Sequence, residues 1–218
     1  MPRIIDVLLA LLALLVLLPL FIPIAIILLL TGEHKVFYLQ TRVGYKNKDF
    51  KIIKFATMLS NSANMGSGSL TLKNDPRVLP FGSFLRKTKI NELPQILNII
   101  IGDLSIVGPR PQMKVDFEKY SDDVQNKIYN VRPGLTGIGS IIFRDEESLI
   151  SLAAENENPH DFYKRVIAPY KGELEIWYHS HRSLFLDFQL IFMTAWAIVS
   201  PETRLYEKWF KDLPVRSF

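Results

Sequence analysis

The chain has 218 residues, of which 48% are hydrophobic and 22% are charged, and its formal net charge is +4. This length buries one good core, so we expect one folded domain with an appendage. The mild positive charge suits an anionic membrane surface or phosphate-bearing substrates, and it is too weak to argue for a nucleic-acid partner. The absence of cysteine excludes disulfides, a thiol nucleophile and zinc sites of the cysteine type.

The segment from Ile4 to Leu30 is apolar apart from Asp6. About 20 apolar residues span a bilayer core, and no small-residue cleavage site follows, so the segment is predicted to be a membrane anchor. Pro19 and Pro23 lie in its middle, where proline removes a backbone donor and kinks a helix. Basic residues flank both ends, which favours two cytoplasmic ends and a re-entrant helix. A single span stays open as the alternative.

Two short segments after the anchor, Val36–Leu39 and Phe50–Phe55, are predicted to be strands. The turn residues between them favour a hairpin. The small polar residues of Ser60–Ser69 predict a flexible loop that could act as a lid. Phe81–Lys89 follows as a basic amphipathic stretch.

A helix is predicted to begin at Asn91 and to end at Gly102. Asparagine is a favoured N-cap residue, Pro94 fits the first turn, and glycine is the usual residue just past a helix. Further helical segments are expected at Asp116–Asn130 and at Glu146–Tyr170, the second interrupted at its proline.

The last segments have the composition of a membrane interface. Ser183–Val199 is marginal in length for a span, which favours a helix buried in the core or lying in the interface. Leu205–Phe218 combines aromatic residues with lysines, a pattern typical of the interface. We therefore predict an α-rich α+β fold, with a re-entrant membrane helix in residues 1–32. Residues 33–218 are predicted to form a cytoplasmic catalytic domain with interfacial amphipathic helices.

The residues with the clearest chemistry begin at Arg86. Asn91 and Glu92 stand about a turn further on, at the predicted helix start, where free backbone amides and the helix dipole favour negative charge. Taken singly, Asn91 is more often a cap and Glu92 more often a surface carboxylate.

Two arginine-proline turns follow. Gly108-Pro-Arg-Pro111 restricts the backbone around Arg110, and a fixed guanidinium suits bidentate phosphate binding. Arg132 repeats the pattern before Pro133, and Arg144 precedes an aspartate. Together with a carboxylate at a helix start, these arginines suggest a diphosphate held by arginines and a divalent metal. From the residues alone, the conclusion is a membrane-attached phosphate binder.

A series of motifs covers most of the chain and ends near Leu186-Asp187. In order, the motifs are Arg42-Val-Gly44, Phe50–Met58, Asp75-Pro-Arg77, Phe84–Lys87, Glu92-Leu-Pro-Gln95, Gly102–Pro111 and Val131–Gly137. The ordered series resembles the bacterial sugar transferase family, small monotopic phosphoglycosyl transferases that begin glycan assembly on polyprenol phosphate. No single motif would be specific, whereas the series is.

The resemblance implies transfer of a sugar 1-phosphate from a UDP-sugar to polyprenol (undecaprenyl) phosphate, with release of UMP. This would be the first membrane step of bacterial glycan assembly, on the cytoplasmic face of the inner membrane. In the implied ping-pong mechanism, the Asp of an Asp-Glu pair attacks the β-phosphate, and Mg²⁺ neutralises the diphosphate.

The resemblance also implies roles for particular residues. Asn91 and Glu92 occupy the catalytic and metal-binding positions, and Pro23 would break the membrane helix. The positions implied for phosphate or nucleotide binding are Arg86, Arg110, Arg132 and Arg144.

Asn91 departs from the family, which has its nucleophilic Asp at this position. An amide cannot replace a carboxylate as nucleophile, and it is a weaker ligand for a hard cation. Three explanations stay open: a branch that uses Glu92 or direct transfer, an inactivated mutant, and a catalytically silent relative. The alternative function is therefore a membrane-bound binder of nucleotide sugar or polyprenol phosphate. The sugar, the glycan pathway and the oligomeric state, a homodimer included, are left open.

Overall fold

The computed structural model describes the whole chain except residues 67, 201, 202 and 217. The helices are α1 (Arg3–Leu30), α2 (Pro80–Lys87), α3 (Gln95–Ile101), α4 (Lys114–Phe117), α5 (Asp122–Lys127), α6 (Ile138–Ile142), α7 (Glu146–Ala153), α8 (Pro159–Phe162), α9 (Ala168–His181), α10 (Leu184–Val199) and α11 (Leu205–Trp209). The strands are β1 (Phe37–Val43), β2 (Asp49–Phe55), β3 (Ser105–Val107) and β4 (Gly134–Thr136). The predicted α-rich fold with a smaller sheet portion is confirmed.

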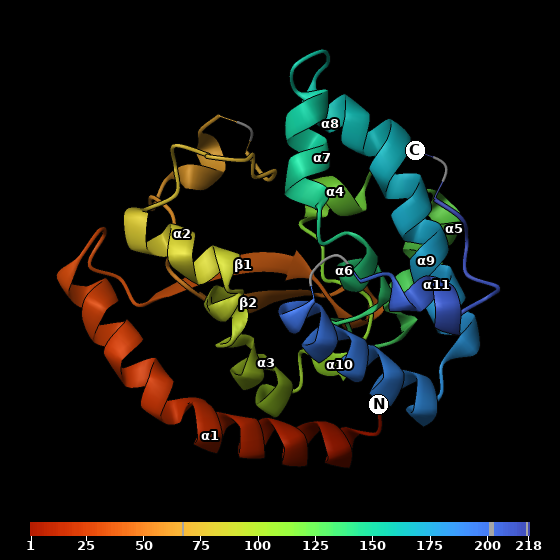
Figure 1. The fold of residues 1–218 in the computed structure, drawn as a ribbon, viewed down its shortest axis with the longest axis horizontal. Coiled ribbons are helices and arrows are strands. Elements are labelled where there is room, and N and C mark those ends of the chain that lie inside the picture. The colour runs from red at the N-terminus through yellow and green to blue at the C-terminus, as the bar shows by residue number, and fades with distance from the viewer. Residues whose placement is uncertain (67, 201–202, 217) are drawn as a thin grey trace.

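Within the described residues, α1 is the one helix long and apolar enough to cross a membrane. It stays helical through Pro19 and Pro23, each of which lacks the amide that would complete the ladder. Figure 1 shows that α1 is bent: a first stretch runs beneath α3, and a second rises toward α2. Proline is a common cause of such a bend, because it removes hydrogen bonds on one side of the helix.

The first turns of α1 are tied to the folded domain by polar contacts. Arg3 donates from its two Nη atoms to the carbonyl oxygens of Ile99 (2.5 Å) and Ile100 (2.9 Å) in α3. The buried carboxylate of Asp6 accepts from Ser105 Oγ (2.9 and 3.0 Å) and from the Ile106 amide (2.9 Å). Asp6, the charged residue of the apolar segment, therefore binds to β3.

The rest of α1 packs against the domain through two small apolar clusters. Ala10 packs with Ile96 and Ile99 of α3. Further along, Leu28 packs with Leu85 of α2 and with the end of β2. Both ends of α1 therefore contact the same folded domain.

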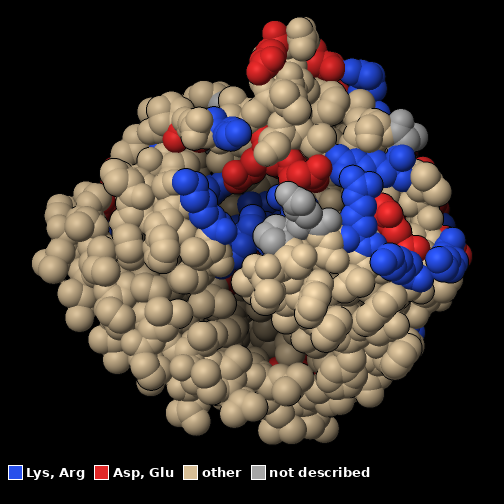
Figure 2. All heavy atoms as spheres, viewed as in Figure 1, with Lys and Arg blue, Asp and Glu red and all other residues tan. Residues whose placement is uncertain are grey.

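A broad apolar surface covers α1 and α10. Large hydrophobic side chains are exposed along α1 at Leu8, Leu12, Leu15 and Val16, and along α10 at Phe185, Phe188, Phe192, Trp196 and Val199. In Figure 2 the part of this face over α1 and α10 is nearly free of charged side chains. Acidic and basic side chains gather instead around a hollow between α2 and α7.

The structure contains two separate two-stranded sheets within the described residues. β1 and β2 form the predicted hairpin, paired antiparallel from Phe37↔Phe55 to Val43↔Asp49. β3 pairs in parallel with β4, which brings the two arginine-proline motifs side by side. A Cβ on Gly134 would lie 2.1 Å from the Gly108 nitrogen, and one on Gly108 would lie 2.4 Å from the Arg132 carbonyl oxygen. Only glycine permits so close an approach of two backbones.

Two helix predictions differ from the structure. α3 begins at Gln95 rather than at Asn91, because residues 90–92 form a 3₁₀ turn that follows Lys89 in the left-handed conformation (φ 60°). The predicted end at Gly102 is correct, and this glycine has φ 114°. Asp116–Asn130 is not one helix: it contains the end of α4, all of α5 and a short 3₁₀ turn, Ile128–Asn130.

The loop predicted to be flexible is held by a buried arginine. Arg77 pairs with Asp75 at 2.6 Å, and both side chains are almost fully buried. Its Nη1 donates to the carbonyl oxygens of Ser62, Met65 and Gly68, each at 2.8 Å. One guanidinium therefore ties together three carbonyl groups of the loop, two of which also accept from amides of the loop itself.

We expect Arg77→Met to loosen this loop and to lower the free energy of unfolding by about 3–5 kcal/mol, because Asp75 would be left as a buried, unpaired charge. Thermal unfolding of the detergent-solubilised protein and limited proteolysis, with cleavage mapped to residues 59–79, would measure both effects. The exposed Lys73→Ala is the control and should behave as the unaltered chain. Equal melting temperatures and equal cleavage of the Arg77 variant would contradict this account.

Candidate functional site

Glu92 is the carboxylate at the centre of the candidate site. It ends the 3₁₀ turn that precedes α3, and its side chain is 16% exposed. Arg110 Nη2 lies 2.9 Å from Glu92 Oε1, and Lys54 Nζ lies 3.1 Å from the same oxygen. The β2 strand, the turn before α3 and the proline-arginine-proline turn after β3 therefore meet at one carboxylate.

The charges at this meeting point perturb one another strongly. Burial alone would raise the pKa of Glu92, but the charges of Arg110 and Lys54 outweigh it and hold that pKa well below its usual range. Burial lowers the pKa of Lys54 to about 8, although the charge of Glu92 opposes this shift. Glu92 is therefore ionised across the physiological range, and Lys54 loses its proton more readily than an ordinary lysine.

Side-chain hydrogen bonds hold the backbone of the turn that carries Arg110. The Tyr129 hydroxyl donates to the Arg110 carbonyl oxygen and accepts from the Gln112 amide, both at 2.9 Å. Arg42 Nη1 donates to the Pro111 carbonyl oxygen at 3.3 Å. A phenol and a second arginine thus add to the stiffness that the two prolines give this turn.

A buried carboxyl group, Glu175 of α9, lies behind the same turn. Burial raises its pKa to about 8, against a hydrogen bond from the Arg110 backbone and the charge of Lys171. Glu175 Oε2 is buried and has no hydrogen-bond partner among the described residues. A Cβ on Gly139 would lie 2.4 Å from Glu175 Oε1, so the glycine makes room for this carboxyl group. At neutral pH, Glu175 is therefore a largely protonated acid against the Arg110 backbone.

Asn91 is buried next to Glu92, and its Oδ1 has no hydrogen-bond partner within the described part of the chain. No group of three or more His, Cys, Asp or Glu side chains that could hold a metal is found among those residues. Mg²⁺ often takes only one or two protein oxygens and completes its shell with water and substrate phosphates. The free oxygen of Asn91 and the carboxylate of Glu92 fit a magnesium ion of that kind.

The other three predicted arginines lie at three different places, and only one of them is near Glu92. Arg86 at the end of α2 pairs with Glu147 of α7 at 2.5 Å, and its charge acts on Lys89 together with those of Glu92 and Arg110. Arg86 therefore belongs to the neighbourhood of Glu92.

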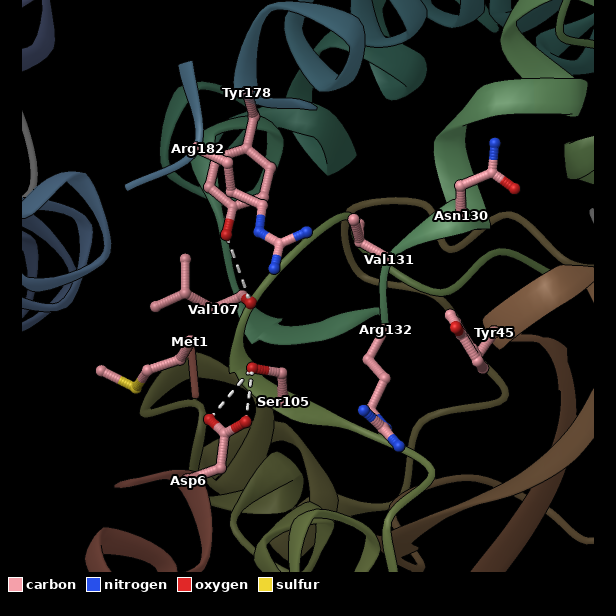
Figure 3. Close-up of a pocket in the computed structure, with 10 residues that line it drawn as sticks. All are labelled: Met1, Asp6, Tyr45, Ser105, Val107, Asn130, Val131, Arg132, Tyr178 and Arg182. Atoms are coloured by element: carbon pink, nitrogen blue, oxygen red, sulfur yellow. Dashed lines mark hydrogen bonds between the residues drawn. The ribbon is translucent and has the colours of Figure 1, made fainter. Parts of the chain in front are cut away.

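Arg132 is not brought to Glu92. Its Nε donates to the carbonyl oxygen of Gly102 (3.0 Å), at the opposite end of α3 from Glu92, and its guanidinium lies over the Tyr45 ring. Figure 3 shows Arg132 on one side of a pocket of about 200 Å³, opposite the hydrogen bonds between Asp6 and Ser105. Arg144 lines a separate pocket beside α10.

Sequence reasoning missed Lys54, Arg42 and Glu175 as parts of the site. Lys54 lies in a strand where lysine is usually solvent-exposed, and only the placement of the strand buries it. Arg42 lies in a motif that was noted, but nothing local connects it to the proline-rich turn. Glu175 lies in α9, whose polar and apolar residues follow no clear pattern, so the sequence gives no sign that this glutamate is buried.

Comparison with known proteins identifies a family that the chain matches. A family model described as bacterial sugar transferase matches residues 1–201. The chain is similar to the UDP-N-acetylgalactosamine-undecaprenyl-phosphate N-acetylgalactosaminephosphotransferase of Aeromonas hydrophila (32% identity, covering 89% of this chain and 43% of the relative). It is also similar to the exopolysaccharide production protein PSS of Rhizobium leguminosarum bv. phaseoli (31%, 93% and 95%). A third relative is the UDP-glucose:undecaprenyl-phosphate glucose-1-phosphate transferase of Escherichia coli (32%, 87% and 38%). The chain thus spans less than half of the Aeromonas and Escherichia relatives and nearly all of the Rhizobium protein.

We expect the buried Glu175 to make stability fall as the pH rises. Its folded pKa lies above the ordinary value of 4.5, so the protonated group stabilises the fold at low pH, and this contribution is lost as the pH rises toward 8. Glu175→Gln keeps the shape of the neutral acid and removes the titration. Relative to this variant, the unaltered chain should lose about 1 kcal/mol of unfolding free energy per pH unit between about 5 and 8.

Denaturation of both proteins at pH 5, 6.5 and 8 would measure this difference. Glu118→Gln, at an exposed position, is the matched control and should follow the unaltered chain at every pH. A constant difference between Glu175→Gln and the unaltered chain would contradict the assignment of a buried, protonated carboxyl group.

Proposed function

The chain belongs to the bacterial sugar transferase family, and we propose that it transfers a sugar 1-phosphate from a UDP-sugar to polyprenol phosphate, with release of UMP. The names of its relatives describe such transfers to undecaprenyl phosphate, with N-acetylgalactosamine in one case and glucose in another. The observation in this chain that carries the proposal is the cluster in which Arg110 and Lys54 meet Glu92.

Cationic side chains outnumber the carboxylate in this cluster. Glu92 is influenced by Arg110, Lys54 and Lys89, and the charge of Arg42 acts on both Arg110 and Lys54. A site of this sign attracts a diphosphate, and the planar Arg110 can hold a phosphate through two parallel hydrogen bonds. Tyr129 fixes the Arg110 backbone and Glu92 holds its guanidinium, so the charge is positioned before the substrate binds.

Magnesium is part of this proposal. We assign it to the Asn91 oxygen and the Glu92 carboxylate, with most of its ligands supplied by the diphosphate and water. When bound, the ion would neutralise negative charge on the diphosphate. Arg110 and Lys54 meanwhile keep Glu92 ionised, so the carboxylate is available as a ligand at neutral pH.

Asn91 decides how the covalent step proceeds. Its side chain occupies a buried position beside Glu92 and offers a free oxygen, but an amide does not attack phosphorus as a carboxylate does. We propose that an aspartate here would complete the reaction centre, and that this sequence carries the centre in a weakened form. The alternative, a membrane-bound binder of nucleotide sugar or polyprenol phosphate without turnover, rests on the same residue.

We further propose that α1 enters and leaves the cytoplasmic leaflet of the bacterial inner membrane by the same face. Arg3 and Asp6 hold its first turns to α3 and β3, while Leu28 packs against α2 of the same domain. A spanning helix would have to release these polar contacts and bury Asp6 in hydrocarbon, which is costly. The bend at the prolines and the uncharged face over α1 and α10 support this arrangement.

We expect Asn91→Asp to raise the rate of UMP release by about 100-fold or more, because it restores a carboxylate nucleophile among cations that stabilise its ionised form. The assay would use a panel of UDP-sugars with Mg²⁺ and undecaprenyl phosphate in detergent. Asn91→Ala is the matched control and should stay at or below the rate of the unaltered chain.

Two other results would change the interpretation. If the unaltered chain matches Asn91→Asp and loses its activity in Glu92→Gln, then Glu92 carries the reaction. If both proteins bind UDP-sugar saturably and neither releases UMP across the panel, the binding function replaces the transferase function. The absence of any UDP-sugar binding would contradict both.

We expect a single cysteine placed at Pro2 or at Lys48 to react with a membrane-impermeant maleimide only after the inner membrane is opened. Both positions are exposed, Pro2 directly before α1 and Lys48 beyond it, between β1 and β2. In a re-entrant arrangement both face the cytoplasm. Glu118→Cys, on the folded domain, is the reference for cytoplasmic labelling, and the chain has no native cysteine to interfere. Labelling of Pro2→Cys in intact spheroplasts, with Lys48→Cys protected, would establish a spanning helix instead.

A further inference from the structure

A pocket of about 450 Å³ lies beside α10, and we call it the α10 pocket. Its apolar wall consists of Ile141 and Ile142 of α6 with Met193 and Ala197 of α10. Three arginines, Arg144, Arg204 and Arg216, also line it. The volume lies within the range of small-molecule sites, which combine apolar walls with a few polar groups in this way.

The arginines of the α10 pocket have donors to spare. Arg216 forms long contacts of 3.3 Å with Asp145, and its buried Nε has no partner among the described residues. Arg204 contacts Glu207 at 3.4 Å on the exposed surface. Arg144 makes no side-chain hydrogen bond or ion pair within the described part of the chain. The pocket therefore offers several guanidinium donors to an anion.

Arg216 is also held in place by aromatic rings. Its guanidinium lies 5.7 Å from the centre of the Phe143 ring and 4.8 Å from that of Phe218. Stacked arginines keep their planar donors in a defined direction, which suits a phosphate better than a mobile surface charge does.

The apolar wall belongs to a helix that also contributes to the uncharged face. Next to the buried Met193 and Ala197, α10 exposes Phe192 and Trp196. Phe192 stacks on Trp196 and on Trp209 of α11, with ring centres 6.1 and 5.6 Å apart. Aromatic clusters of this kind are typical of the membrane interface. A long apolar chain that leaves the pocket along α10 would therefore pass into the bilayer.

The pocket also lies next to the Glu92 cluster. Asp145, which lines it, directly precedes α7. The next residue, Glu146, pairs with Lys171 at 2.7 Å, and its charge acts on Arg110. Glu147 then pairs with Arg86. Three consecutive acidic residues therefore connect the pocket with the neighbourhood of Glu92, and in Figure 2 acidic side chains lie between two groups of basic ones.

We propose that the α10 pocket is the docking site of the acceptor, an isoprenoid monophosphate. Arg144, Arg204 and Arg216 hold its phosphate. Met193 and Ala197 contact its first isoprene units, and the remaining chain lies along α10 in the membrane. This inference rests on the proposed function, and it assigns Arg144 to the acceptor rather than to the nucleotide.

Binding of undecaprenyl phosphate to the full-length protein in detergent micelles, followed by thermophoresis, tests the assignment. The double variant Arg144→Ala, Arg204→Ala should bind at least about tenfold more weakly, because each lost charged contact weakens the hold on the phosphate. Its affinity for UDP-sugar should stay within about twofold of that of the unaltered chain. Arg165→Ala, whose exposed guanidinium pairs with Glu157 near α8, is the matched control and should leave both affinities unchanged.

Competing ligands identify what the pocket recognises. Undecaprenol should compete poorly because it lacks the phosphate, and inorganic phosphate should compete poorly because it lacks the chain. Equal competition by phosphatidic acid would replace the proposal with a general headgroup site, and a parallel loss of UDP-sugar affinity would make the pocket a nucleotide site. Unchanged binding of undecaprenyl phosphate to the double variant would overturn the proposal. A further result would be that binding of undecaprenyl phosphate depends on the arginines while no variant of position 91 transfers sugar phosphate. That result would support the docking site and contradict the proposed transferase function.

Discussion

The hydrogen bonds of Asp6 link the long apolar helix α1 to the strand that leads to the candidate site. This buried carboxylate accepts from Ser105 and Ile106 in β3, and the same strand leads within a few residues to Arg110. A carboxylate in an otherwise apolar helix would be costly in hydrocarbon, so its partners in β3 determine where α1 begins on the domain. The position of α1 on the domain and the position of Arg110 are therefore coupled through the three residues of β3.

The centre itself shows how a small domain can gather charge. Glu92 comes from the turn before α3, Lys54 from β2 and Arg110 from the turn after β3, and no two of them are neighbours in sequence. Each would be expensive to bury alone, and together they compensate one another. The surplus of cations over the single carboxylate is what a bound anion would balance.

Much of this arrangement follows from local sequence rules, and the exceptions have physical reasons. The hairpin of β1 and β2 and the end of α3 at Gly102 were predictable, because turn residues and a left-handed glycine act locally. The start of α3 was not, because Lys89 takes a left-handed conformation that its side chain does not indicate. Membership of Glu92 and Arg110 in one site was expected from the motifs. The separation of Arg132 from them depends on which end of α3 its strand approaches, and Lys54 is buried only by packing.

The contact between Gly108 and Gly134 has a consequence for how this sequence can vary. Neither glycine has a side chain to offer a ligand, yet each leaves no space for a Cβ because the other backbone fills it. The backbones of the two arginine-proline motifs are consequently packed directly against each other, although about 25 residues of chain separate them. In a library of random substitutions, both codons should tolerate almost no replacement, even alanine. A scan for intolerant positions would therefore report these glycines as strongly as the residues that bind the substrate.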